Sequence, residues 1–503
     1  MVDANIYAHL SAWLAEAMRK DFDARYKSDK YTLQKGGAFH KKFSPRFESL
    51  LIDLVKEAVC RGKERNILCG EDSTTLYVWK GDGWEEIKDR GFLSELIERT
   101  LRSLEVGLMY QQNSSPRIAR SCMETLQSSE EYLYKPNRRY VAFTNGVFDL
   151  EKGKLKQFSR EFVPAIVLDI PYANPKQHYI DCSNRYGIAD NPCKLWERFI
   201  KEVMPNKEFR EAFQSFCGAL LADRDELKIE YMCCVHGPGS NGKSVLVETI
   251  SKVFGKRYYS AFTPKQLFSQ GTSSMFCMAD LDGKIVNLVG DLDSNSDFSG
   301  GAWKSFVSGE DVRVRSPYER KYRWVKPPLM MCCTNEMPRS KDDSHGNHRR
   351  ILPIASTEVR YEGDKRDTQL THKLTTADAR TFIFSWIYEG YKRVMANKGD
   401  IPLSDEVLRA IETMQNERNS MRLWWFGGEC PWRKPKGDER AEWVYLSEIY
   451  RKYTQWCKEY NEREFYSTDL GRMISSLGFS KDEGNKRSMS KGTQYLVARK
   501  DNE

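Results

Sequence analysis

The sequence has no long hydrophobic run and no C-x-x-C pair of cysteines, and each absence excludes a class of protein. None of its apolar segments approaches the ~18 residues that a membrane-spanning helix needs, so we expect no membrane association. The amino-terminal segment is a charged, amphipathic helix pattern that lacks the apolar core and the cleavage site of a signal peptide. The 13 cysteines are odd in number and form no C-x-x-C pair, which favours buried, reduced thiols over zinc or disulfides. Together these features predict a cytoplasmic protein.

Basic residues only slightly outnumber acidic residues in the sequence. The chain has 79 Lys and Arg against 71 Asp and Glu, a net charge of +8, which permits nucleic-acid binding without showing it. At 503 residues, 40% of them hydrophobic, the chain is an ordinary globular protein too long for one core. The pattern predicts an α+β domain over 1–190, a helical linker or collar over 191–228, an α/β core over 229–375, a helical lid or connector over 376–430, and an aromatic, basic tail over 431–503.

Residues 237–244, GPGSNGKS, lie between a short apolar run and a predicted helix. Glycines at this spacing let backbone N–H groups turn inward and hold phosphate oxygens. Lys243 is placed to reach the β- and γ-phosphates, and the Ser244 hydroxyl to ligate Mg²⁺. The complete spacing in this context favours a phosphate-binding loop over a chance glycine-rich turn. The predicted nucleoside triphosphate contacts are Gly237, Gly239, Ser240, Asn241, Gly242, Lys243, Ser244 and Val245.

Two further apolar strands end in polar residues. The first, 284–291, ends in Asp291 and is followed by Asp293; a carboxylate beside the phosphate loop can hold Mg²⁺ and polarise water. An acidic turn and a polymerase-type metal pair are the alternatives for these two residues. The second strand, 328–335, ends in Asn335, which can contact the γ-phosphate or the attacking water, although a strand-end Asn is usually a turn residue.

Basic residues are concentrated in the segment between these two strands. From Arg313 to Lys326 there are six basic residues and one acidic residue, with three aromatic residues among them, in a strand–turn–strand pattern. Basic and aromatic side chains together are typical of loops that bind single-stranded nucleic acid, but a charge-protected edge hairpin is the alternative. The candidate DNA contacts are Arg313, Arg315, Arg320 and Lys321. Farther on, Arg349 or Arg350 is placed to act on a neighbouring subunit's triphosphate.

Taken in order, GPGSNGKS, IVNLVGDLD, KSFVSGED, LMMCCTN and DDSHGNHRR resemble the motif series of superfamily 3 replicative helicases. The resemblance is to the phage, plasmid and poxvirus primase-helicase branch. It extends upstream to FTNGVFDL at 143–150 and to a Trp-containing hairpin at 77–84. It also extends to the tail over 431–503, where two helices and a basic wing are similar to a winged helix. The resemblance covers roughly residues 70–500.

This resemblance implies a multidomain α/β protein with an AAA+-like P-loop ATPase core, an α+β amino-terminal domain and a winged helix that binds DNA through Lys486 and Arg487. It implies an ATP- and Mg²⁺-dependent homo-hexamer that translocates on single-stranded DNA in a bacterial cytoplasm, recognises origin DNA, and works with a separate primase. By position it assigns the phosphates and Mg²⁺ to Lys243 and Ser244, the Walker B acid to Asp291, sensor 1 to Asn335, and the arginine finger to Arg350 or, failing it, Arg349.

Two departures from the family pattern affect these expectations. Gly290 stands where the family usually has the first Walker B acid, which leaves the division of roles between Asp291 and Asp293 open. The ~70 residues before the resemblance are too few for a primase domain, so we expect no primer synthesis. An origin-binding initiator that uses ATP only for assembly is the main alternative. A metabolic P-loop kinase is a weaker one, because it explains neither the hairpin nor the tail.

Overall fold

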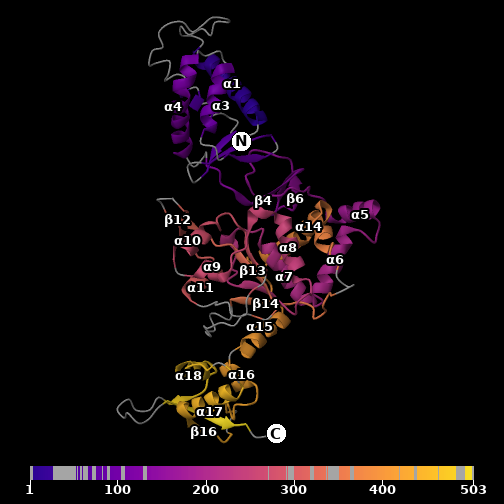
Figure 1. Ribbon diagram of the computed structural model, residues 1–503, viewed down its shortest axis with the longest axis vertical. Helices are drawn as coiled ribbons and strands as arrows, with labels where there is room; N and C mark the ends of the chain where they lie inside the picture. Colours follow the sequence, from indigo (N-terminus) through magenta and orange to yellow (C-terminus); the bar gives the residue numbers. More distant parts are fainter. Residues whose placement is uncertain are drawn as a thin grey trace, which may run out of the picture. The chain divides into compact units, whose positions relative to one another are not determined.

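The structure is a computed structural model, in which the chain forms two compact units, Met1–Asn174 and Pro175–Glu503 (Figure 1). None of the described helices is long and apolar enough to cross a membrane. The described residues are 4–26, 52–53, 55–56, 59, 66–70, 75–81, 83–87, 91–103, 108–128, 133–269, 271–290, 292, 300–317, 322–335, 337, 350–362, 367–418, 420–435, 439–460, 462, 464–482 and 493–500.

The first unit combines helices with a three-stranded antiparallel sheet. The helices are α1 (Ala4–Tyr26), α3 (Phe92–Ser103) and α4 (Leu108–Gln127), and the strands are β1 (Ile67–Cys69), β2 (Leu76–Trp79) and β3 (Trp84–Ile87). Helix α3 buries Phe92, Leu96 and Ile97, whose spacing places them on one helical face against α1 and α4. Strands β2 and β3 pair antiparallel with Trp79 opposite Trp84, which confirms the predicted hairpin.

A second sheet in this unit contains the FTNGVFDL sequence. Its strands are β4 (Asn137–Phe143), β5 (Gly146–Asp149), β6 (Lys154–Lys156) and β7 (Pro164–Val167), in the order β6-β5-β4-β7. In the β4–β5 turn, the Asn145 side chain accepts from the Tyr172 N–H and donates to the Tyr172 carbonyl, both at 2.9 Å. Gly146 has φ +152°, and a Cβ there would lie 2.5 Å from the Lys156 carbonyl oxygen, so glycine is required. Asn145 and Gly146 of the FTNGVFDL segment therefore have structural roles in this turn.

Asp149 is the buried charge of this sheet. Its carboxylate has no exposed surface and lies 2.9 Å from Arg139 Nη2 and 2.7 Å from Lys156 Nζ. Burial alone would raise the pKa of Asp149, but the hydrogen bonds from Arg139 and Lys156 outweigh that effect and hold the pKa well below its usual range. Asp149 is therefore ionised and ties β4, β5 and β6 together.

The second unit is built on a parallel sheet. Its strands are β8 (Met232–His236), β9 (Tyr259–Ser260), β10 (Val286–Val289), β13 (Leu329–Thr334) and β14 (Ile351–Ala355), in the order β14-β8-β13-β10-β9. Strands β10 and β13 are buried along their whole length, as expected where helices cover both faces of a parallel sheet. The chain is thus a multidomain, mixed α/β protein. The helices that follow strands in this sheet are α8 (Lys243–Phe254), α9 (Pro264–Phe268), α10 (Thr272–Ala279) and α11 (Gly301–Ser308).

Helices that precede the parallel sheet in the sequence pack against helices that follow it. They are α5 (Pro175–Tyr186), α6 (Pro192–Val203) and α7 (Lys207–Ala219) before it, and α13 (Leu370–Leu374), α14 (Ala377–Ala396) and α15 (Asp405–Arg418) after it. Helices α7 and α14 cross so closely that a Cβ on Gly218 would lie 2.0 Å from the Tyr391 backbone nitrogen. Figure 1 shows α7, α8 and α14 as neighbours. Helices α6 and α7 of the predicted collar and α14 of the predicted connector therefore pack together in one helical layer.

The division between the units differs from the predicted boundary at residue 190. Helix α5 belongs to the second unit, because Arg185 Nη1 and the Tyr186 hydroxyl donate to the Asp378 carboxylate on α14, at 2.7 and 2.6 Å. These contacts join residues nearly 200 positions apart, which a reading along the sequence cannot detect.

The carboxy-terminal module begins before the predicted residue 431. Its elements are α16 (Ser420–Phe426), β15 (Trp432–Arg433), β16 (Glu442–Tyr445), α17 (Leu446–Glu459), α18 (Ser467–Ser476), β17 (Lys481–Asp482) and β18 (Gln494–Arg499). Trp424 and Trp425 of α16 are buried in the same apolar cluster as Tyr453 of α17 and Ile474 of α18. Helix α16 is therefore part of this module's core.

Candidate functional site

The 237–244 loop connects the end of β8 to the first turn of α8, and its glycines are sterically required. Gly237 has φ +150°, and a Cβ there would lie 2.3 Å from Ser356 Oγ. Gly242 has φ +94°, and its Cβ would lie 2.8 Å from Val203 Cγ2. Because α8 begins at Lys243, its first backbone N–H groups have no acceptor within the helix and are suited to an anion.

Asn241 fixes the conformation of the loop. Its side-chain amide donates to Ser356 Oγ and to the Thr357 carbonyl, both at 2.8 Å, and its oxygen accepts from Lys243 Nζ at 2.9 Å. The side chain is buried, with 1% exposed. Asn241 was predicted as a nucleotide contact; in the structure its side chain fastens the loop to the chain after β14.

The Lys243 ammonium lies at the centre of the site. It donates to the carbonyls of Gly237 and Pro238, both at 2.7 Å, and lies 3.3 Å from Asn335 Oδ1. Asn335 follows β13, and the parallel register pairs Thr334 with His236, which brings the strand end beside the loop. Two of the predicted residues, far apart in sequence, are thus within contact distance.

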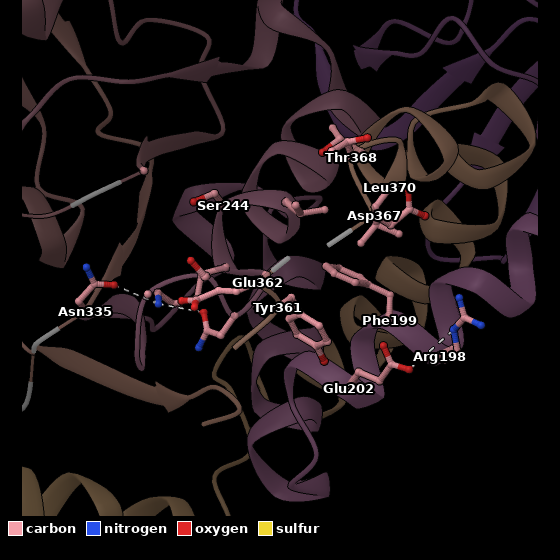
Figure 2. A pocket seen from close by; sticks show the side chains of 18 of the residues that line it. Arg198, Phe199, Glu202, Ser244, Asn335, Tyr361, Glu362, Asp367, Thr368 and Leu370 are labelled. Carbon is pink, nitrogen blue, oxygen red and sulfur yellow. Dashed lines mark hydrogen bonds and ion pairs between the residues drawn. The ribbon is translucent and has the colours of Figure 1, made fainter. Parts of the chain in front are cut away.

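These groups face a cavity of about 740 Å³, a volume within the usual range for small-molecule sites. Figure 2 shows Asn335 toward one end of the cavity and Phe199 and Asp367 toward the other, with Ser244 exposed between them. The cavity is lined by Leu195, Arg198, Phe199, Glu202, Gly239, Ser240, Asn241, Gly242, Lys243, Ser244, Val245, Gly290, Thr334, Asn335, Tyr361, Glu362, Asp367, Thr368, Leu370 and Thr371.

The wall opposite the strand ends was not predicted from the sequence. It is formed by α6 and by residues 361–362 and 367–371, and backbone hydrogen bonds join α6 and Tyr361 to neighbouring parts of the site. The Tyr361 N–H donates to the Ser240 carbonyl, and the Thr357 N–H to the Val203 carbonyl, both at 2.7 Å. Phe199 follows ordinary helical spacing, so nothing in the sequence distinguishes it from a core residue.

Asp367 gives the wall a negative charge. A hydrogen bond from Lys373 lowers the pKa of its carboxyl group, and a hydrogen bond from the Gln369 N–H lowers it further, with a smaller effect. The cavity therefore has cationic and N–H donors at the loop end and an ionised carboxylate at the far end. A ligand with phosphates at one end and hydrogen-bond donors at the other fits this distribution of charge.

Several predicted site residues lie outside the described residues. Gly290, which precedes Asp291, lines the cavity. The Leu292 N–H donates to the Cys333 carbonyl at 2.9 Å, and Thr334 Oγ1 donates to the Leu292 carbonyl at 3.1 Å. Gly290 and Leu292 are thus both placed near the end of β13. The predicted residues outside the described part are Asp291, Asp293, Arg320, Lys321, Arg349, Lys486 and Arg487.

Arg350 does not belong to this cavity. It directly precedes β14, whose first residue, Ile351, pairs with Met232, whereas Ala355 pairs with His236 beside the loop. Arg350 is therefore at the opposite end of the sheet from Lys243, roughly 16 Å along a five-residue strand. Its Nη2 lies 3.3 Å from Ser308 Oγ, at the end of α11.

The predicted basic hairpin is confirmed as a structure. Strands β11 (Val312–Val314) and β12 (Arg323–Val325) pair antiparallel, with Arg313 opposite Trp324. The Arg313 guanidinium lies 4.4 Å from the Tyr322 ring centroid and that of Arg315 lies 5.5 Å from it. Trp324 is 68% exposed. The hairpin therefore presents cations and an aromatic surface to solvent.

The base of the hairpin is fastened to the segment before β8. Lys326 Nζ lies 2.6 Å from Asp225 and 3.1 Å from Asp311. Arg224 Nη2 donates to the Val307 carbonyl at 2.7 Å and to the Ile229 carbonyl at 2.9 Å. The end of α11, the hairpin and the entry to β8 are thus joined by charged side chains.

Comparisons with known proteins relate parts of the chain to viral proteins. A family described as "D5 N terminal like" matches residues 49–205, and a "Family of unknown function (DUF5906)" matches residues 235–350, the span from β8 to Arg350. "Putative helicase L207/L206" of Acanthamoeba polyphaga mimivirus is 25% identical over 234 residues, 45% of this chain and 22% of that protein. "Putative helicase 184R" of Invertebrate iridescent virus 6 is 24% identical over 250 residues, 46% of this chain and 24% of that protein.

The chain thus matches under a quarter of the length of these curated relatives. Among solved structures, the C-terminal region of NrS-1 (305–718) is 11% identical, with 86% of this chain and 96% of that chain covered, at a TM-score of 0.39. The sequence matches thus relate parts of this chain to viral proteins that carry the name of putative helicases.

Proposed function

We propose that this chain is an ATP-dependent replicative DNA helicase of a phage or other mobile genetic element, with a superfamily 3, AAA+-like core. The observation that carries the proposal is the contact of Lys243 with Asn335 across the 237–244 loop, beside a cavity of nucleotide size. The viral relatives with helicase names support it at the level of the family. The exposed, basic hairpin supports a nucleic-acid substrate.

ATP would place its phosphates against the loop and the first turn of α8. Lys243 would then exchange the carbonyls of Gly237 and Pro238 for phosphate oxygens, a gain because the charge of the ammonium is met by a full opposite charge. The Ser244 hydroxyl, exposed in the cavity, fits a Mg²⁺ ligand, with Asp291 as the second ligand by sequence. A bound Mg²⁺ ion would neutralise part of the negative charge of the phosphates.

The proposal includes assembly as a homo-hexameric ring, and the position of Arg350 supports contact between subunits. Because Arg350 is at the far end of the sheet from its own cavity, it can act as a finger only on the ATP of a neighbouring subunit. Its contact with Ser308, at the end of α11, would connect the neighbour's ATP to the hairpin that follows α11. Hydrolysis in one subunit would thereby move a DNA-binding element of the next.

DNA would be held by the hairpin in the ring's channel, with phosphates at Arg313 and Arg315 and a base stacked on Trp324. The carboxy-terminal module supports a second, origin-binding role. Its order of one helix, two strands, two helices and two strands, from α16 to β18, supports the proposal that this module is a winged helix. This module also favours the second candidate function, an origin-binding initiator that uses ATP for assembly rather than unwinding.

The Lys243→Ala variant tests the proposal, with Lys252→Ala, an exposed lysine on the same helix, as the matched control. Loss of one charge-assisted contact weakens ATP binding about 10- to 100-fold, and removal of a transition-state donor lowers turnover at least about 100-fold. We expect DNA-stimulated ATPase activity and strand displacement to be lost in Lys243→Ala and kept in Lys252→Ala.

One outcome would decide against the helicase, and another against the role of the hairpin. ATP-dependent assembly on origin DNA without strand displacement by the wild type would favour the initiator. Unwinding that persists when Arg313 and Trp324 are both replaced by Ala would remove the hairpin from the mechanism, whatever the result for Lys243.

A further inference from the structure

One histidine and two cysteines meet where α5 approaches α6. His178 and Cys182 are four residues apart on the buried face of α5, and Cys193 is the second residue of α6. Their ligand atoms all lie within 4.8 Å of one another. The three residues are 8%, 1% and 0% exposed. Among the described residues, this cluster is separate from the cavity and plays no part in the proposed function.

Asn191 holds the cluster together. As the N-cap of α6, its side-chain oxygen accepts from the Cys193 N–H at 2.8 Å, while its nitrogen donates to the Tyr179 carbonyl and to Ser183 Oγ on α5, at 3.1 and 2.7 Å. The cap therefore fixes the start of α6 against α5, so the position of Cys193 is set before any ligand binds.

The spacing of these atoms matches a tetrahedral zinc centre. Zn–S bonds of about 2.3 Å and Zn–N bonds of about 2.0 Å give tetrahedron edges of about 3.6 Å between N and S and about 3.8 Å between two sulfurs. His178 Nε2 lies 3.6 Å from Cys182 Sγ, already at that edge length. The remaining edges need to close by about 1 Å at most, from the 4.8 Å limit.

We propose that His178, Cys182 and Cys193 bind a structural Zn²⁺ ion, with the Asp378 carboxylate as the fourth ligand. Asp378 Oδ1 lies 3.9 Å from His178 Nε2 but outside the group of three ligand atoms that lie within 4.8 Å of one another, so the carboxylate has to move toward the sulfurs to complete the site. Arg185 and Tyr186 already orient the Asp378 carboxylate, as outer partners do in metal sites. Two thiolates, one imidazole and a carboxylate are ligands that Zn²⁺ takes in proteins.

Binding has a definite proton balance. Zn²⁺ replaces one proton on each thiol, so two protons leave, and the imidazole binds in its neutral form. Burial raises the pKa of both thiols, most for Cys193, so without an ion the two side chains are neutral. The ion would also break the 2.8 Å hydrogen bond between His178 Nε2 and the Asp378 carbonyl. The competing arrangement is therefore a pair of packed thiols beside a hydrogen-bonded histidine.

A zinc ion here would join α5, α6 and α14. Helix α6 also carries Phe199 and Glu202 of the cavity wall, two turns beyond Cys193. The ion would thus stabilise that wall without touching the nucleotide. The zinc site is argued from residues outside the nucleotide cavity. A negative result for zinc binding would therefore leave the proposed ATPase function unaffected.

The test is metal analysis of the full chain, purified under reducing conditions without ATP. We expect about one zinc ion per chain, and Co²⁺ loading of the zinc-free chain should give a thiolate-to-cobalt charge-transfer band. Both should be lost in the Cys182→Ser/Cys193→Ser double variant and kept in Cys277→Ser, a cysteine on α10 away from the cluster.

The Asp378→Asn variant provides a second measurement should the double variant not fold. It keeps both thiols, and we expect it to retain the charge-transfer band with Co²⁺ affinity about 10- to 100-fold weaker. Absence of zinc and of the band in the wild type would overturn the proposal, as would a band unchanged in the double variant. A Cys182–Cys193 disulfide found by mass spectrometry in the purified chain would also overturn it.

Discussion

The position of Arg350 leads to a quantitative complementation experiment. Lys243→Ala removes the loop lysine and Arg350→Ala removes the proposed finger, so each variant alone should be inactive, with ATP turnover roughly 1,000-fold lower. Arg350 lies five residues along β14 from Ala355, which pairs with His236 just before the loop of Lys243; this separation, roughly 16 Å, is longer than an arginine side chain. A finger from the same chain is therefore excluded by the geometry.

Co-expression of the two variants in equal amounts should restore activity. An intact interface needs the loop from an Arg350→Ala chain and the finger from a Lys243→Ala chain, each with a probability of one half. About a quarter of the interfaces are then complete, and we expect about 25% of the wild-type ATPase rate if sites act independently. Native mass spectrometry would establish that mixed assemblies form.

The matched control is the double variant, Lys243→Ala/Arg350→Ala, co-expressed with either single variant. Neither mixture contains a complete interface, so both should remain inactive. If mixed assemblies form but the two single variants do not rescue each other, Arg350 is not the trans finger. Significant ATPase activity of Arg350→Ala alone would refute the same assignment, without bearing on the role of Lys243.

Three further predictions concern the fold and the hairpin. Asp149→Asn should lower the free energy of unfolding by about 3 kcal/mol in urea titrations; because the folded pKa is depressed, this difference should be full above about pH 4 and shrink as pH falls below it. Gly390→Ala places a Cβ 2.0 Å from the Gln214 carbonyl and should cost about 3 kcal/mol by calorimetry, whereas Gly301→Ala, with nothing within 4 Å, should cost under about 1 kcal/mol. Trp324→Ala should weaken single-stranded DNA binding roughly 10-fold by fluorescence anisotropy, and Trp324→Phe much less; equal affinities would exclude stacking.

The loop and the hairpin could be predicted from the sequence because both are local. The spacing of the glycines before Lys243 marks a strand-to-helix turn, and the alternation around Arg313 marks a strand. The α/β core followed from short apolar strands alternating with helices, and the structure shows that its strands are parallel. The roles of Lys243 and Asn335 remain predictions, but their contact depends only on two adjacent strands ending at the same edge.

The cavity wall and the His178 cluster could not be predicted. Phe199 reaches the site because the Val203 carbonyl, at the end of α6, binds the Thr357 N–H, a contact between segments that no periodicity relates. Cys193 lies eleven residues after Cys182, a spacing without a known ligand pattern, and only the N-cap at Asn191 brings it back. Both features arise from tertiary hydrogen bonds rather than from sequence motifs.

The hydrogen bond from Thr357 to Val203 bears on how this protein can be dissected. A fragment that contains only the span from β8 to β14 would retain the loop. It would lose Val203, which packs against Gly242, and the side of the cavity that α6 forms. The smallest autonomous piece that binds nucleotide should instead begin near residue 175 and continue past α14. Deletion series and partial proteolysis would then show nucleotide binding and resistance to protease being lost together when α6 is removed.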